Sequence, residues 1–223
     1  MAENNNIHNP QPLNQNDAIT FIIQCYFGDI SDPILASINR AYLDMQTHTI
    51  SRDPDNPDIL FQRRKTITEY LHDEISRIPN GMEFDDWHRT ISQGIKERYA
   101  ELSFGQIQKW LNMTIKYLFT LKELGVDGIS EYISVDHTDD FHPALDSFVL
   151  QAINRTSPSW SNIQEYNYYN ETRQLLSFAQ EYLEWPQYAF NASHRMNGEE
   201  RLAAVGTYKR YVQDHGNYAF NNQ

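Results

Sequence analysis

The stretch from Leu102 to Leu124 constrains the fold of this chain more than any other. Ser103 followed three residues later by Gln106 is a capping-box pattern, which predicts a helix start, and Gly125 is typical of the residue just past a helix end. On a helical wheel, apolar side chains cover nearly the whole circumference, which is typical of a helix buried on most sides. The sequence therefore predicts a core helix that other elements surround.

One strip of this predicted helix is polar. It holds Lys109, Asn112, Lys116 and Thr120, with Met113 at its edge. Lys109 and Lys116 are seven residues apart and therefore lie on one face of the helix. Because lysine is rarely buried without a partner, two lysines on the polar strip of a core helix require either an ion pair or a function.

Helical patterns dominate the rest of the chain. Glycine and proline are few, with 9 of each in 223 residues, and there are no alternating runs rich in Val and Thr. Hydrophobic spacing and cap signals predict further helices at about residues 16–28, 33–50, 57–78, 83–99, 142–153, 161–185 and 199–213. The short turn AELSFGQ joins two of these helices into a helix–hairpin–helix element.

We therefore predict an all-α fold. Residues 1–15 are rich in Asn, Gln and Pro, and we expect them to form a flexible N-terminal lead-in. Residues 16–223 are expected to form a single all-α domain of two helical lobes around a cleft. The helix after the hairpin and the helix that carries Asp146 would line that cleft.

The net charge limits the classes of function that fit this chain. The net charge is −12, and proteins that coat nucleic acid are generally basic, so the total counts against that class while leaving room for a local positive cleft. The chain has one cysteine and a polar N-terminus without a signal-peptide pattern, and we expect a cytoplasmic location. No stretch is long and apolar enough to span a bilayer, so no membrane partner is expected.

Lys109 and Asp146 form the first candidate site. A lysine shielded from water loses its proton more readily and can act as an amine nucleophile. A nearby aspartate can stabilise positive charge that develops on a sugar, or it can shuttle a proton. Backbone N–H groups around Gly105 and Gln106, at the helix start, can hold a phosphate. On residue types alone, a snorkelling lysine and a helix-capping aspartate are the more common interpretation.

The arrangement of these residues resembles the helix–hairpin–helix DNA glycosylases, and most closely their archaeal 8-oxoguanine DNA glycosylase-like branch. Gln108-Lys109 and Lys116 match the Gln-Lys pair and the second lysine that follow the hairpin in that branch. The segment from Pro143 to Val149 is similar to its Pro-Val-Asp-x-x-Val segment, with one extra residue between Pro and Asp. The resemblance covers about 50 residues, and LSFGQ has one glycine where the family has Leu-Pro-Gly-x-Gly.

This resemblance implies a DNA glycosylase that flips out a modified base and excises it, with strand cleavage as a second step. Lys109 would be the Schiff-base nucleophile on the sugar and Asp146 its activating carboxylate. The implied partner is DNA containing a modified base, bound by a monomer, and neither a metal nor a cofactor is implied because C-terminal iron–sulfur cysteines are missing. The residues expected to contact substrate or DNA are Gly105, Gln106, Asn112, Lys116, His142 and Trp160.

Two of these expectations have structural alternatives. Trp160, together with Tyr166, Tyr168 and Tyr169, can stack on an extruded base, but aromatic residues at helical spacing are more often core. The polar segment HTDDFH, which contains His142, has the density of a ligand site, but it also fits a solvated loop that caps the next helix.

Two other function classes remain open. His48, His72-Asp73 and Asp139 or Asp140 resemble the ordered pattern of the HD-type metal-dependent phosphohydrolases, in which divalent metals activate water. The second class is a non-enzymatic acidic helical module that binds a protein partner. Bound divalent metal in the purified protein would favour the first of these. Lack of any hydrolytic activity, with Lys109 buried in a salt bridge, would favour the second.

Overall fold

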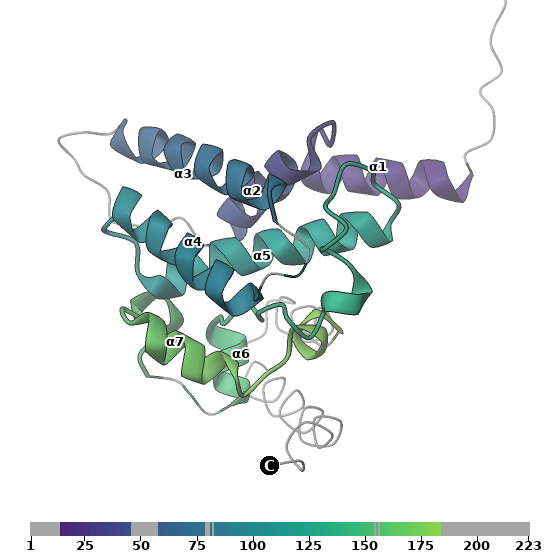
Figure 1. Ribbon diagram of the computed structural model, residues 1–223. Helices are drawn as coiled ribbons and strands as arrows, with labels where there is room; N and C mark the ends of the chain where they lie inside the picture. Colours follow the sequence, from purple (N-terminus) through teal and green to yellow (C-terminus); the bar gives the residue numbers. More distant parts are fainter. Residues whose placement is uncertain are drawn as a thin grey trace, which may run out of the picture.

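The structure is a computed structural model, and it describes residues 14–45, 58–78, 81, 83–153, 155 and 157–183. Throughout these ranges the regular structure is helical and contains no strand, so the predicted all-α class is confirmed. The elements are α1 (Gln15–Phe27), α2 (Pro33–Asp44), α3 (Ile59–Ser76), α4 (Phe84–Arg98), α5 (Phe104–Glu123), η2 (Val135–His137), α6 (Ser147–Ala152), η3 (Trp160–Asn162) and α7 (Tyr166–Arg173). Figure 1 shows α5 through the middle of the molecule, with α1, α2 and α3 above it and α6 and α7 below.

The upper helices begin close to where cap signals predict. Asp32 accepts a hydrogen bond from the Leu35 N–H, and Pro33 occupies the first position of α2. α1 is capped by Asn14, which exchanges hydrogen bonds with Asp17 in a capping box. The helix therefore starts within the predicted lead-in, whose last two residues supply its cap and its first position. The predicted continuation of α2 beyond residue 45 and the predicted helix at 199–213 fall outside the ranges described.

The predicted central helix is confirmed in its bounds and its burial. Ser103 Oγ accepts from the Gln106 N–H at 3.1 Å, and Gln106 Oε1 accepts from the Ser103 N–H at 2.9 Å. Nearly every residue of α5 is buried, and Trp110 donates from Nε1 to the Ile38 carbonyl of α2 at 3.0 Å. Because α2 packs along α5 more extensively than any other described pair of elements, these two helices form the centre of the core.

A short turn joins α4 to α5. Lys96, in the last turn of α4, donates to the carbonyl groups of Ala100 and Leu102 at 2.7 and 2.6 Å. The lysine thereby satisfies two carbonyl groups of the turn. The predicted connectivity of helix, turn and helix is present.

The lower layer departs from the prediction. The helix expected at 142–153 is shorter, because residues 142–146 have no regular secondary structure and α6 begins at Ser147. The helix expected at 161–185 is broken into η3, α7 and a further helical turn at 178–183. The capping box predicted for Ser161 and Gln164 is wrong. α7 starts at Tyr166 after Glu165, which makes no side-chain cap.

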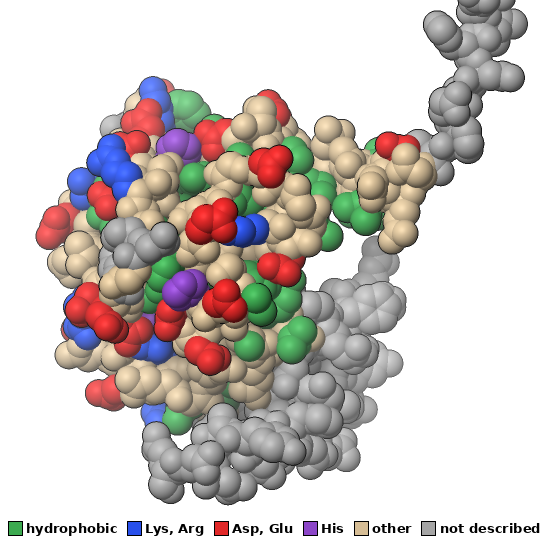
Figure 2. Space-filling view, turned by 45° about the vertical axis from the view of Figure 1, so that its right-hand side comes forward, with side chains coloured by type: hydrophobic (Ala, Val, Ile, Leu, Met, Phe, Trp, Pro, Cys, Tyr) green, Lys and Arg blue, Asp and Glu red, His purple; other side chains and the backbone are tan. Residues whose placement is uncertain are grey.

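The surface agrees with the acidic composition. Figure 2 shows acidic side chains spread over the visible face, with basic side chains gathered mainly toward its left side. Among the helices the structure describes, none combines the length and the apolarity that a bilayer crossing requires.

Candidate functional site

Three of the residues singled out in the sequence meet beneath the first turns of α5. Lys109 Nζ lies 3.7 Å from Oδ2 of Asp146 and 4.7 Å from the centre of the Trp160 ring. The three side chains come from α5, from the residue before α6 and from η3. All three are buried, so the amine and the carboxylate face each other away from bulk water.

The carboxylate of Asp146 is held by the start of α6. Oδ1 accepts hydrogen bonds from the N–H groups of Phe148 and Val149, at 2.9 and 3.0 Å. Asp146 is therefore the N-cap of α6, and the orientation of its carboxylate is set by the helix backbone. With Oδ1 on the helix, Oδ2 is the oxygen that faces Lys109.

Gly105 has a packing role in the structure. Its N–H donates to the Ile163 carbonyl at 3.0 Å, and a Cβ at this position would overlap the carbonyl group of Trp160. The absence of a side chain lets η3 approach α5 closely, which brings Trp160 to Lys109. The N–H of Gln106 is likewise bonded to Ser103. The expectation that these two N–H groups hold a phosphate is therefore corrected, since both already donate within the protein.

Lys116 faces the interior two turns after Lys109. It forms an ion pair with Glu181 of the helical turn at 178–183, and both side chains are buried. Burial raises the pKa of the Glu181 carboxyl above its ordinary value, the charge of Lys116 opposes this, and the charge of Asp146 adds to it. The expectation that Lys116 contacts the DNA backbone is corrected, because its charge is used inside the core.

Asn112 is the hub of a buried polar network. Its Nδ2 points to Gln108 Oε1, to the Pro143 carbonyl and to the Tyr169 hydroxyl at 2.9 to 3.1 Å. Its Oδ1 accepts from Nε2 of His88 at 2.8 Å. The amide has no donor left for a ligand, so the expected contact between Asn112 and substrate is corrected to an internal one.

His142 belongs to the same network. Nε2 donates to Asp85 at 2.6 Å, and Nδ1 accepts from the Tyr169 hydroxyl at 2.9 Å. Burial lowers the pKa of His142 to about 4, although Asp85 acts in the opposite direction. The ring is therefore neutral at pH 7 and fully bonded, which corrects its expected role as a DNA contact.

Several members of this network were missed in the sequence. His88 lies on the buried face of α4, four residues after Phe84, and its pKa is held well below the ordinary value mainly by burial. Its Nδ1 accepts from Tyr166, and Asp85 also pairs with Arg173. The position of His88 on the apolar face of a helix was the sequence signal that could have indicated a buried histidine. Its hydrogen-bond partners lie on distant segments, so the sequence pattern could not indicate them.

The tyrosines considered for base stacking are largely core residues in the structure. Tyr169 is fully buried with its hydroxyl inside the network, and Tyr166 packs against Phe104. The Tyr168 hydroxyl donates to the Ser157 carbonyl. Of the aromatic residues considered as a stacking platform, Trp160 is the one that reaches Lys109.

The predicted ligands of the metal site do not gather. His72 Nε2 lies 2.9 Å from Asp32, Asp73 pairs with Arg77, and Asp140 contacts His137 at 3.0 Å. His48 falls outside the ranges described. Across the side chains that the structure does describe, no group of three or more His, Cys, Asp or Glu could hold a metal ion.

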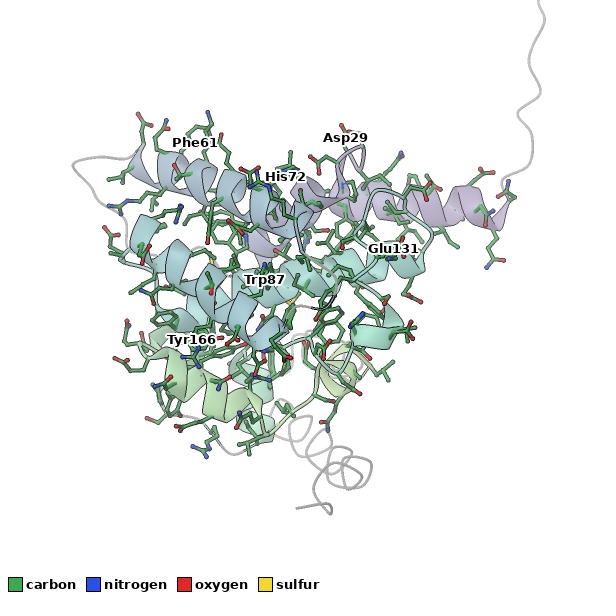
Figure 3. The ribbon with its side chains drawn as sticks, viewed as in Figure 1. Asp29, Phe61, His72, Trp87, Glu131 and Tyr166 are labelled. Carbon is green, nitrogen blue, oxygen red and sulfur yellow. The ribbon has the colours of Figure 1, made fainter. Side chains whose placement is uncertain are left out.

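A cavity opens beside the second half of the polar strip. Its volume is about 500 Å³, and it lies between α1, α5 and the turn at 178–183. Its lining is mainly apolar and includes Tyr26, Phe27, Met113, Lys116, Tyr117 and Tyr182. Figure 3 labels Tyr166, which borders a second, more polar cavity of about 490 Å³ on the outer side of α4.

Comparison with protein-family models, with curated protein sequences and with solved structures gives no match for this chain. The arguments about its function therefore rest on the residues and geometry described above.

Proposed function

We propose that this protein is a DNA glycosylase that excises a modified base, with Lys109 as the nucleophile and Asp146 as its partner. The observation that carries the proposal is the buried Lys109 amine, which faces one Asp146 oxygen at 3.7 Å and the Trp160 ring at 4.7 Å. An amine, a carboxylate and an aromatic face are the groups needed for attack on a sugar, stabilisation of its positive charge and contact with a base.

The chemistry would proceed in two steps. The Lys109 amine attacks C1′ of the damaged nucleotide and forms a C–N bond, while the bond to the base breaks and the base leaves with its electron pair and takes up a proton. Opening of the sugar ring then leaves an imine to Lys109, which water hydrolyses or which permits strand cleavage. The Asp146 carboxylate stabilises the positive charge on the sugar during the first step.

Lys109 and Asp146 form a buried ion pair whose separation is longer than that of a direct hydrogen bond. A charge-assisted hydrogen bond between an ammonium and a carboxylate is about 2.7–2.9 Å long. Lys109 Nζ stays at 3.7 Å from Asp146 Oδ2, and Asp146 directs Oδ1 to two helix N–H groups. Asp146 is therefore held by the start of α6 in addition to its ion pair with Lys109.

The apolar cavity farther along α5 is the proposed place for an extruded base, although Lys109, Asp146 and Trp160 are not among the residues that line it. Met113 and Lys116 line it and follow Lys109 along the same strip of α5. Its aromatic lining suits a flat base, and about 500 Å³ accommodates a nucleobase with a bulky modification. In this proposal the layer of α1 to α3 and the layer of α6 and α7 are the two lobes, and the α4–α5 turn is the helix–hairpin–helix element.

Trapping of a covalent adduct tests the proposal. Sodium borohydride reduces an imine between Lys109 and DNA, so the full-length protein is incubated with duplexes that each carry one modified base, 8-oxoguanine included. We expect a trapped adduct on at least one duplex, and we expect Lys109→Gln to abolish both trapping and base release. The matched control is Lys122→Gln, since Lys122 lies on α5 but pairs with Glu131 at the surface.

Full base release by Lys109→Gln would end the mechanism. A protein that releases no base from any duplex would instead support the non-enzymatic alternative, which one observation favours. Phe21 and Ile22 of α1 are about two-thirds exposed, and exposed apolar residues on one helix are typical of protein-binding surfaces.

A further inference from the structure

The segment before α6 has an unusual set of hydrogen-bond partners. Residues 142–146 are buried, yet they belong to neither a helix nor a strand. Buried backbone groups need partners, and in this segment side chains of α5 supply them. Asn112 donates to the carbonyl of Pro143, and Gln108 bonds to Leu145.

The contact between Gln108 and Leu145 uses both backbone groups of one residue. Gln108 Nε2 donates to the Leu145 carbonyl at 2.8 Å, and Gln108 Oε1 accepts from the Leu145 N–H at 3.1 Å. The second Nε2 hydrogen goes to the Gly105 carbonyl at 2.8 Å, and Asn112 also donates to Oε1. Both donors and both lone pairs of the amide are therefore used.

The same contact links the backbones that carry the two groups of the candidate site. Leu145 directly precedes Asp146, and Gln108 directly precedes Lys109. The hydrogen bonds of Gln108 thus join the two backbone positions from which the amine and the carboxylate extend. Because Oδ1 of Asp146 is bonded to α6, the position of the carboxylate depends on where residues 142–146 lie.

We propose that Gln108 is a positioning residue, whose two hydrogen bonds to the Leu145 backbone set the distance between the Asp146 carboxylate and the Lys109 amine. This inference rests on the proposed function, because it assigns Gln108 a part in the same reaction. Only a side chain with a donor and an acceptor at this reach serves both groups of Leu145. Glutamate lacks the donor, leucine lacks both, and asparagine is one methylene too short.

The test combines kinetics with a double-mutant cycle. Single-turnover base release and borohydride trapping are measured for Gln108→Leu and Gln108→Glu, with DNA binding measured separately. We expect both variants to lose about 10- to 100-fold in rate with little change in affinity for the duplex. In the Asp146→Asn background the same substitutions should cost little more, because residues that act through one another are not additive.

A matched control separates positioning from general destabilisation. Thr114→Val removes another buried hydrogen bond of α5, the one from Thr114 to the Trp110 carbonyl. Its rate of base release should stay within about twofold of wild type. If Gln108→Leu and Asp146→Asn reduce the rate independently, so that their losses multiply, the positioning role is overturned.

Hydrogen exchange at Leu145 gives a readout that does not depend on activity. We expect the Leu145 N–H to be protected in the wild type and to exchange at least about tenfold faster in Gln108→Leu and Gln108→Glu. Undiminished protection in both variants would overturn the inference even if the enzyme is active. Absence of any trapped adduct in the wild type would instead overturn the proposed function, and with it the catalytic part of this assignment.

Discussion

The two lysines of the polar strip lie in different surroundings, although both are buried on the same face of α5. Lys116 makes a direct ion pair with Glu181, which is fully buried. Lys109 stands 3.7 Å from Asp146, a carboxylate that is already bonded to the start of α6. Both lysines are thus paired with buried carboxylates, and the partner of Lys109 is also bonded to the start of a helix.

This difference separates a structural charge from a reactive one. Removal of one member of a buried ion pair leaves the other uncompensated, which is costly. Removal of Lys109 leaves Asp146 on two N–H groups at a helix N-terminus, where a negative charge is stabilised. We therefore expect Lys116 to contribute more to the stability of the fold and Lys109 to contribute more to the proposed reaction.

The largest effect on stability is expected at the second lysine. Lys116→Met should lower the free energy of unfolding by about 3–5 kcal/mol, because it leaves the Glu181 carboxylate buried without its partner. Urea denaturation at pH 7 measures this change. Lys109→Met, by contrast, should cost no more than about 1 kcal/mol, since its partner keeps the bonds to α6.

The double variant Lys116→Met with Glu181→Leu provides the control for that comparison. Replacing both charges with apolar side chains should recover most of the lost stability, because a buried pair contributes little over well-packed apolar residues. Equal losses of stability for the two single lysine variants would contradict the distinction between the two sites.

The second effect on stability concerns His142, which belongs to the buried polar network around Asn112. His142 has a pKa of about 4 in the folded protein and an ordinary value of 6.5. Because the folded value is the lower one, the unfolded chain binds more protons between these values. The contribution to stability is then fully present above pH 6.5 and is lost as the pH falls through 4. A shift of this size corresponds to a loss on the order of 3 kcal/mol, measured by urea denaturation between about pH 7.5 and 4.

His142→Gln should remove the contribution of His142 to this part of the pH profile, since glutamine can donate to Asp85 and accept from Tyr169 without titrating. The contribution of His88, whose pKa is also held well below its ordinary value by burial, should remain. Glu181 acts in the opposite sense. Its raised pKa makes folding more favourable as the pH falls toward the ordinary carboxyl value of 4.5. The measurement is therefore made in the Glu181→Gln background as well, and an unchanged slope in His142→Gln would show that His142 does not titrate as described.

The smallest effect on stability is expected at Asp146, where it separates the two roles of this residue. Asparagine caps a helix nearly as well as aspartate, whereas alanine does not. Asp146→Asn and Asp146→Ala should both slow base release by about 100-fold or more, because both remove the charge. Both variants leave Lys109 without its ion-pair partner, and Asp146→Ala should be about 1 kcal/mol less stable than Asp146→Asn because only asparagine keeps the cap. Thermal denaturation and single-turnover kinetics of the two variants test this, and equal stability would show that the cap contributes nothing.

The sequence predicted the elements whose signals are local. α5 carries its capping box and its apolar wheel within its own residues, and the structure confirms both. The start of α6 was predicted several residues too early, because the backbone of residues 143–145 bonds to Gln108 and Asn112 instead of continuing the helix. A pattern within one segment does not show that a distant helix supplies its hydrogen bonds.

The candidate site, like the fold, was predictable from the sequence only in part. Lys109 and Asp146 were singled out by their residue types and by a resemblance, and Trp160 was singled out as an aromatic side chain that could stack on a base. The structure brings the three together. Asn112 and His142 were predicted to contact substrate or DNA, and the structure bonds both to residues far away in the chain. A polar residue on a buried helix looks the same in sequence whether it faces a ligand or a partner.

The ion pair of Lys116 and Glu181 also has a consequence for how the chain is made. Synthesis on the ribosome delivers α5 long before residues 178–183, so Lys116 emerges while its partner does not yet exist. A charged lysine disfavours burial of the second half of α5 during that interval. The final packing of the core around α5 therefore depends on a segment that emerges late, and it is expected to follow synthesis more than to accompany it.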